Sequence, residues 1–234
     1  MEEENIDKLV SYLRLTQDEL KLKLKTELEV LGRETCWNNG FLYSPGTHPV
    51  LLIAHLDTFH KKLPTEFYVD DAEPKSRPGG DLRCKGGMGI GGDDRCGVYI
   101  VMEIIRQLNC HVLFCEDEEI GRIGAEKFSR SEIRPEVQFI VEFDRRGKDD
   151  AVFYDCKNED FIKFVEQFGF SRAEGTFSDI STIAPELKIA AVNLSSGYYE
   201  AHIDTEYIRL DEVESVIERA IPLIADVSKK YEYV

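Results

Sequence analysis

The chain has 234 residues, 42% of them hydrophobic and 32% charged, and this balance excludes a disordered, collagen-like or fibrous protein. Acidic residues number 45 and basic residues 29, which gives a net charge of −16 and argues against nucleic acid as a partner, because no basic cluster offsets repulsion by the phosphates. The sequence contains no apolar run of membrane-spanning length and no signal-peptide pattern, so we expect a cytoplasmic protein with no membrane partner.

The first half of the chain shows clear local signals. Apolar positions at helical spacing predict a helix over 5–32 that restarts with a capping box at Thr16. The continuous apolar run 50–54 predicts a strand that is buried on both faces. Residues 61–92 are rich in Gly and lack periodicity, which favours loop and a hairpin before a helix over 94–108.

The second half alternates strands and helices. Apolar runs and helical spacing predict the remaining elements, which are strands over 111–115, 137–143, 151–154 and 189–194 and helices over 159–168, 178–184 and 211–231. This alternation predicts an α/β three-layer sandwich with a mixed, largely parallel central sheet flanked by helices. No linker or internal repeat divides the sequence, so we expect one domain over 1–234.

Three of the predicted strands end in histidine or acidic residues. His55 and Asp57 follow the first strand, Glu118 and Glu119 the second, and Asp144 the third. Ligands of open α/β sheets bind outside the carboxyl ends of the strands, and imidazole and carboxylate groups are common ligands of divalent metals. Asp57 lies two positions after His55 on the same strand face, so its carboxylate can accept the spare imidazole proton.

Five sequence elements occur in an order that is characteristic of one family. They are His-Leu-Asp-Thr at 55–58, Gly-Gly-Asp-Asp-Arg-Cys-Gly at 91–97, Glu-Glu-Ile-Gly at 118–121, an isolated Asp144 and a late His202. The sequence therefore resembles the co-catalytic di-zinc exopeptidases, and especially their peptidase T-like (aminotripeptidase) branch, over most of its length. This resemblance implies the zinc exopeptidase fold.

The resemblance also implies a pair of metal sites. Two divalent ions would bind, zinc first of all, with cobalt or manganese as alternatives. His55 and Asp144 would hold one ion and Glu119 and His202 the other, while Asp93 would bridge the two. Three ligands for each ion leave room for a shared water, and two metal ions can activate water and polarise a carbonyl together.

The roles of the remaining acidic residues follow from the same resemblance. Glu118 would be the general base, because a carboxylate that also ligated the metal would lose its basicity, and Asp57 would orient His55. Glu142 lies on the same strand face as Asp144 and stays an alternative ligand, although Asp144 stands at the end of the strand. In this family the peptide bond after the bridging aspartate is cis, which here predicts a cis bond at 93–94.

Two later segments resemble those that line the substrate pocket in the family. They imply Ser178, Asp179, Asn193 and Gly197 as substrate-binding residues, while a helix N-cap at Ser178 and a turn at Gly197 are the alternative interpretations. Peptidase T-like enzymes carry a lid domain after the aspartate ligand, whereas only a short segment separates Asp144 from Ser178. We therefore expect a catalytic domain without a lid or dimerisation domain, and the oligomeric state stays open.

The function that these residues predict is hydrolysis of a peptide or amide bond in a small substrate by a di-zinc metallopeptidase. An aminopeptidase acting on a short peptide is the first expectation, and an amidohydrolase of the N-acyl-amino-acid or carboxypeptidase type is the alternative. A non-catalytic binding module on the same fold is the rival from another class. The Gly-x-Gly-x-x-Gly match at 87–92 does not favour a dinucleotide, because Asp93 and Asp94 would face the pyrophosphate.

Overall fold

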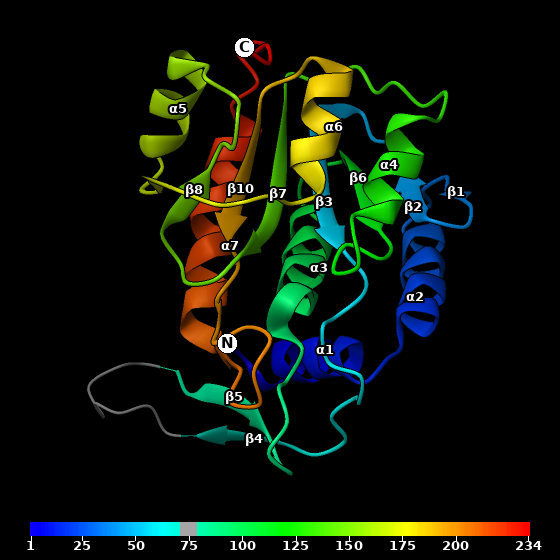
Figure 1. Ribbon diagram of the computed structural model, residues 1–234, viewed down its shortest axis with the longest axis vertical. Coiled ribbons are helices and arrows are strands. Elements are labelled where there is room, and N and C mark those ends of the chain that lie inside the picture. The colour runs from blue at the N-terminus through cyan, green and yellow to red at the C-terminus, as the bar shows by residue number, and fades with distance from the viewer. Residues whose placement is uncertain (71–78) are drawn as a thin grey trace.

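The computed structural model describes residues 1–70 and 79–234 and is built around a sheet of eight strands (Figure 1). In spatial order the strands are β1 (Cys36–Trp37), β2 (Phe41–Ser44), β6 (Cys110–Cys115), β3 (His48–His55), β7 (Phe139–Arg145), β10 (Ala191–Ser195), β8 (Asp150–Val152) and β9 (Ser171–Ala173). The four central strands β6, β3, β7 and β10 run parallel, while β1, β2 and β8 form antiparallel pairs at the flanks. The predicted mixed, largely parallel sheet is confirmed.

Helices cover both faces of this sheet. One face packs against α1 (Glu3–Leu13), α2 (Gln17–Val30), α3 (Gly92–Ile104), α5 (Glu159–Glu166) and α7 (Leu210–Ala225), and the other against α4 (Ile123–Ser129) and α6 (Asp179–Leu187). In Figure 1, α4 and α6 lie in front of the sheet, with α3 and α7 behind it. Successive residues of β3 alternate between the two cores, with Leu52 on one side and Ile53 on the other, which confirms a strand buried on both faces.

Local signals account for the helix boundaries in the first half of the chain. The predicted helical region is interrupted after Leu13 and restarts at Gln17, where Thr16 and Glu19 form the predicted capping box. The helix predicted over 94–108 is α3, which ends four residues earlier. The short helix α4 was not predicted at all.

A second sheet of four antiparallel strands lies beyond the carboxyl ends of the central strands (Figure 1). Its order is β11 (Tyr198–Tyr199), β12 (Tyr207–Arg209), β5 (Asp81–Cys84) and β4 (Phe67–Asp70). The pairing of β4 with β5 confirms the predicted hairpin, although positions 71–78 of that segment lie outside the described residues. The loop from β11 to β12 carries His202, so this sheet positions one of the predicted metal ligands.

Two further observations bear on the sequence-based expectations. The segment between Asp144 and Ser178 forms β8, α5 and β9, and the first and last of these extend the edge of the main sheet. The expectation of a single domain without a lid stays a prediction. Within residues 1–70 and 79–234, no helix combines the length and the apolar content needed to cross a bilayer.

Candidate active site

The central strands deliver the predicted polar residues to one edge of the sheet. Because β6, β3 and β7 are parallel neighbours, their carboxyl ends meet at the same place. His55 is the last residue of β3, Glu118 and Glu119 follow β6, and Asp144 is the penultimate residue of β7. Residues separated by up to 89 positions in the sequence are therefore neighbours in space.

Asp93 is the centre of this group, because its two carboxylate oxygens face different histidines. Asp93 Oδ1 lies 3.1 Å from His55 Nε2, and Asp93 Oδ2 lies 3.2 Å from His202 Nε2. His55 Nε2 is also 3.5 Å from Asp144 Oδ1, and His202 Nε2 is 2.8 Å from Glu119 Oε1. The five residues thus form two groups, each with one imidazole and one carboxylate of its own, that share Asp93.

Asp57 fixes the orientation of both His55 and the loop after β6. His55 Nδ1 lies 3.1 Å from Asp57 Oδ1, and this contact orients the ring so that Nε2 is directed at the Asp93 carboxylate, also 3.1 Å away. The backbone N–H groups of Glu118 and Glu119 donate to the two oxygens of Asp57 at 2.9 and 3.0 Å. Burial alone would raise the pKa of Asp57, but the hydrogen bonds from His55 and from these N–H groups lower it.

The peptide bond between Asp93 and Asp94 is cis, as predicted. The Asp94 carboxylate accepts backbone N–H groups from His55 at 3.1 Å and from Gly97 at 3.0 Å. An oxygen of Asp94 lies within 4.8 Å of possible ligand atoms of His55 and Asp144. Since both its oxygens already accept backbone N–H groups, we assign Asp94 to holding β3 against α3 and Asp93 to the cluster.

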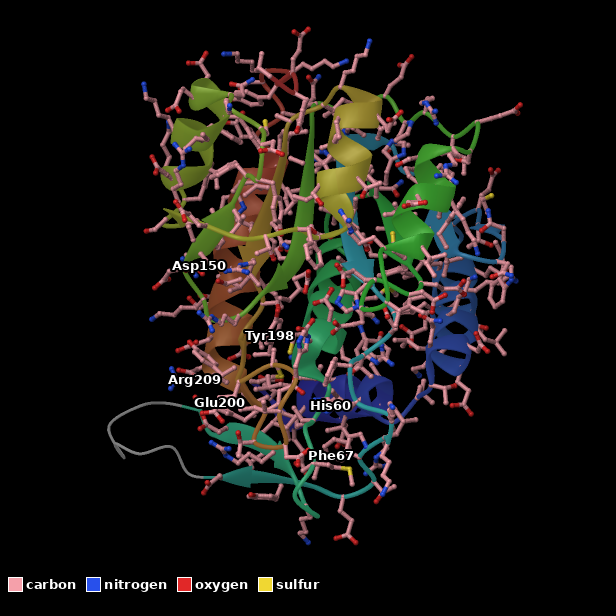
Figure 2. All side chains as sticks on the ribbon, viewed as in Figure 1. His60, Phe67, Asp150, Tyr198, Glu200 and Arg209 are labelled. Carbon is pink, nitrogen blue, oxygen red and sulfur yellow. The ribbon has the colours of Figure 1, made fainter. Side chains whose placement is uncertain are left out.

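Glu206 is a site residue that the sequence analysis missed. Its carboxylate is completely buried and accepts the backbone N–H groups of Gly91 at 2.8 Å and Asp93 at 3.0 Å. His60 Nε2 lies 2.6 Å from Glu206 Oε2, and this contact raises the pKa of His60. Figure 2 shows His60 in the region between the main sheet and the second sheet. Glu206 therefore anchors the backbone that presents Asp93.

A cavity of about 360 Å³ opens over the cluster. Its lining includes Glu118, the residue directly before Glu119. Unlike Glu119, Glu118 forms no ion pair with His202, and it forms none with His55. Burial raises the pKa of Glu118 to about 8, and Asp144 adds to this effect while His55 opposes it. The cavity is lined by Phe59, Asp93, Glu118, Glu119, Asp144, Arg145, Tyr154, Thr176, Phe177, Tyr198 and His202.

The four residues that were predicted to bind substrate are buried behind this cavity. Asn193 Oδ1 accepts the backbone N–H of Asp144 at 2.8 Å, and its Nδ2 donates to the Tyr154 hydroxyl at 3.0 Å, so Asn193 positions two residues of the cavity wall. Gly197 has a φ of 92° at the turn before β11. Direct contact of these residues with a substrate stays a prediction.

The environment of Glu142 separates it from the cluster. Ser178, the N-cap residue of α6, donates its hydroxyl to the fully buried Glu142. Asp179 is also fully buried, and burial raises its pKa to about 7. Between the two candidate ligands on β7, the geometry favours Asp144, which lines the cavity, over Glu142, which lies behind it.

Comparisons with known proteins define the fold. No protein-family model and no curated protein matches the sequence, whereas solved structures give the chain the fold of the peptidase T-like zinc exopeptidases. Aminopeptidase PepT from Bacillus cereus has a TM-score of 0.77 at 15% identity, with 96% of this chain and 98% of that chain covered. A tripeptidase from Staphylococcus aureus has a TM-score of 0.75 at 12% identity, with the same coverage of 96% and 98%.

The fold is also found in enzymes of different chemistry. Glutaminyl cyclase from Porphyromonas gingivalis has a TM-score of 0.64 at 15% identity, and the match covers 94% of this chain and 95% of that chain. The expected zinc exopeptidase fold is therefore confirmed for this chain. At these identities the likeness establishes the fold alone, so the activity has to be argued from the site.

Proposed function

We propose that this protein is a metal-dependent peptidase that cleaves a short peptide, with removal of the N-terminal residue as the first expectation. Two divalent ions, zinc in the first place, would be held by two ligand groups. His55, Asp93 and Asp144 would form one group, and His202, Asp93 and Glu119 the other. The observation that carries the proposal is the position of Asp93, whose two oxygens lie 3.1 and 3.2 Å from the Nε2 atoms of two different histidines.

The donor set fits a cation. His55 Nε2 lies 3.1 Å from Asp93 Oδ1 and 3.5 Å from Asp144 Oδ1, so one imidazole nitrogen and two carboxylate oxygens face one another. Carboxylates this close together require a positive charge among them. In the metal-free protein a proton on His55 can supply it, because the carboxylates raise the pKa of His55 against the effect of burial, and a divalent ion would supply it in the metal-bound protein. Imidazole with carboxylate is a ligand set that zinc accepts, and cobalt and manganese accept it too.

The residues around the cluster have separate tasks in hydrolysis. When bound, the metal ions would polarise the scissile carbonyl and lower the pKa of a water. Glu118 takes the proton from the attacking water and passes it to the leaving amine. Asp57 keeps His55 in the tautomer that directs Nε2 into the cluster, and Asn193 and Glu206 hold the backbones of Asp144 and Asp93.

The first experiment measures metal content. Protein dialysed against zinc and then against metal-free buffer is analysed by mass spectrometry of the metal, and we expect two ions per chain. Circular dichroism on the same sample confirms that the protein is folded. A folded protein that binds no zinc at saturating concentration would refute the proposal.

The second experiment identifies the reaction with a panel of small substrates. Leucyl-glycine, its N-acetyl form and glutaminyl-glycine are incubated with the zinc- or cobalt-loaded protein, and products are separated by chromatography. Hydrolysis of the free-amine peptide alone supports the aminopeptidase, and hydrolysis of the N-acetyl form alone supports the N-acyl-amino-acid alternative. Glutaminyl-glycine is included because a glutaminyl cyclase shares the fold, and its cyclisation without hydrolysis of any substrate would replace the peptidase proposal.

A further inference from the structure

The cavity over the cluster shares lining residues with two neighbouring cavities. At one end Phe59, Glu119 and His202 also border a neighbouring cavity of about 660 Å³. At the other end Tyr154 and Thr176 also border a cavity of about 310 Å³. The cavity over the cluster therefore adjoins one cavity on the side of Phe59 and His202 and another on the side of Tyr154 and Thr176.

Arg145 belongs to the end formed by Tyr154 and Thr176. Gly175 locates it there, because a Cβ atom at Gly175 would lie 3.3 Å from the Tyr154 ring and 3.6 Å from Arg145 Nη1. Gly175 itself lines the cavity of about 310 Å³, so Arg145 Nη1 lies close to the place where the two cavities adjoin. Tyr154 has a φ of 48°, in the left-handed region that bulky residues rarely adopt and that is concentrated at ligand sites.

The guanidinium of Arg145 is held in place by part of its N–H groups, and other N–H groups have no hydrogen-bond partner in the part of the chain that the structure describes. Its Nη2 donates to the carbonyl oxygen of Glu174 at 3.3 Å and lies 3.5 Å from Asp150 Oδ2, on a side chain that is 39% exposed. Within the described residues, the contact with Glu174 is the only hydrogen bond that this side chain donates. Because Nε is buried and Nη2 is engaged with Glu174 and Asp150, the N–H groups of Nη1 are the ones left for a ligand.

The charge of the cavity makes Arg145 distinctive. Four carboxylates line the cavity, from Asp93, Glu118, Glu119 and Asp144, and two divalent ions would balance them. Among the described residues that line this cavity, Arg145 is the only lysine or arginine, and its acidic neighbour Asp150, at 3.5 Å, lies on a partly exposed side chain outside the lining. A planar carboxylate is the anion that a guanidinium binds best, through two parallel hydrogen bonds.

We propose that Arg145 binds the free carboxylate of the substrate, and so restricts the enzyme to short peptides or acyl-amino acids whose carboxyl group lies close to the scissile bond. This inference rests on the proposed function, because it uses the metal ions to balance the acidic lining. Arg145 follows Asp144 directly in β7, so the carboxylate site and the cluster are positioned by the same strand.

The test compares two substrates that differ only in the carboxyl group. Leucyl-glycine and leucyl-glycinamide are hydrolysed by the zinc-loaded wild type, and we expect kcat/KM to be roughly ten- to hundredfold higher for the free carboxylate. Arg145→Met should reduce this ratio to about one, mainly through KM, and Arg145→Lys should restore part of it because it keeps the charge but not the planar fork. Arg130→Met is the matched control, since Arg130 is 80% exposed, lines neither this cavity nor the one of about 310 Å³, and within the described residues pairs with Glu126 alone.

A binding measurement separates this inference from the proposed function. Calorimetric titration of both peptides into zinc-loaded Glu118→Gln protein, with and without Arg145→Met, should show the same preference for the free carboxylate without turnover. If this preference is present but no peptide is hydrolysed by the wild type, the carboxylate site stands and the peptidase does not. If the wild type hydrolyses both peptides equally well, or if Arg145→Met and Arg145→Lys both leave the preference intact, the inference is wrong while the peptidase stands.

Discussion

The substitution Glu206→Gln tests whether Glu206 holds the backbone at Gly91 and Asp93 in place. Glu206 contacts no side chain of a proposed metal ligand, so its role would be to position Asp93 through the backbone. Glu206 Oε2 accepts from Gly91 N and His60 Nε2, and Oε1 accepts from Asp93 N at 3.0 Å. A glutamine has only one acceptor oxygen, so in either orientation its NH2 group must face at least one of these donors. The substitution keeps the size of the side chain, so any effect comes from the lost hydrogen bonds and the lost charge rather than from packing.

The magnitude follows from the buried contacts. A hydrogen bond to a charged group contributes about 1.5–3 kcal/mol, and a buried donor left without a partner adds to the loss. We expect Glu206→Gln to lower the free energy of unfolding of the metal-free protein by about 2–3 kcal/mol. Because the backbone of Asp93 is released, zinc affinity should fall roughly ten- to hundredfold, as it does when groups that orient metal ligands are removed.

The assay is urea unfolding in the presence of a chelator, followed by circular dichroism, together with competition for zinc against a chromophoric chelator. Glu66→Gln is the matched control in the second-sheet region, since Glu66 and its partner Lys85 are both more than 60% exposed, and it should change stability by less than about 0.5 kcal/mol. Equal stability and equal zinc affinity of Glu206→Gln and Glu66→Gln would refute the anchoring role.

Three further predictions follow from the site. Glu118→Gln should lower turnover by roughly a hundredfold or more, while its metal content stays near that of the wild type. His202→Ala, by contrast, should lower the metal content. Substantial activity in Glu118→Gln would mean that the base is assigned wrongly. Metal removal should leave a cooperatively folded protein, because a core of this size does not need the metal site. The urea midpoint should be lower, because the uncompensated carboxylates repel one another. A chelator that unfolds the chain at room temperature would contradict this prediction. The hydrogen bond with Glu206 raises the pKa of His60, so the pair stabilises fully below the unfolded pKa and its contribution is lost as pH rises through the folded pKa. In metal-free protein the difference in stability between the wild type and His60→Asn should therefore shrink as pH rises above the unfolded pKa of histidine, and a difference that widens would overturn the assignment.

The parts of the fold that sequence predicted are those with strong local signals. The apolar run of β3 and the capping box at Thr16 specify their elements without help from distant residues. The helix α4 has no such signal, because it is only seven residues long and its N-cap residue Arg122 has a left-handed conformation and makes no side-chain capping bond. Strands β11 and β12, with two and three residues, are too short for a periodic pattern to identify them.

The residues of the candidate site also differ in whether the sequence could predict them. His55, Glu119 and Asp144 could be placed together from their positions at the ends of strands, because parallel neighbours share an edge. His202 lies in a loop without a periodic pattern, and only the resemblance to a known family pointed to it. Glu206 acts through hydrogen bonds to residues more than 100 positions earlier, and no local pattern encodes such a contact.

The separation in sequence between Glu206 and Asp93 also constrains how the protein is made. The hydrogen bond between them spans 113 positions, and the contact of His202 with Glu119 spans 83. During synthesis the ribosome releases the chain from its N-terminus, so β3, β6 and β7 emerge before either partner from the loop between β11 and β12. A nascent chain that ends before position 202 carries the first group of proposed ligands in full but lacks His202 of the second. If the protein binds two ions as proposed, the second ion would therefore be bound only after the central sheet has been synthesised.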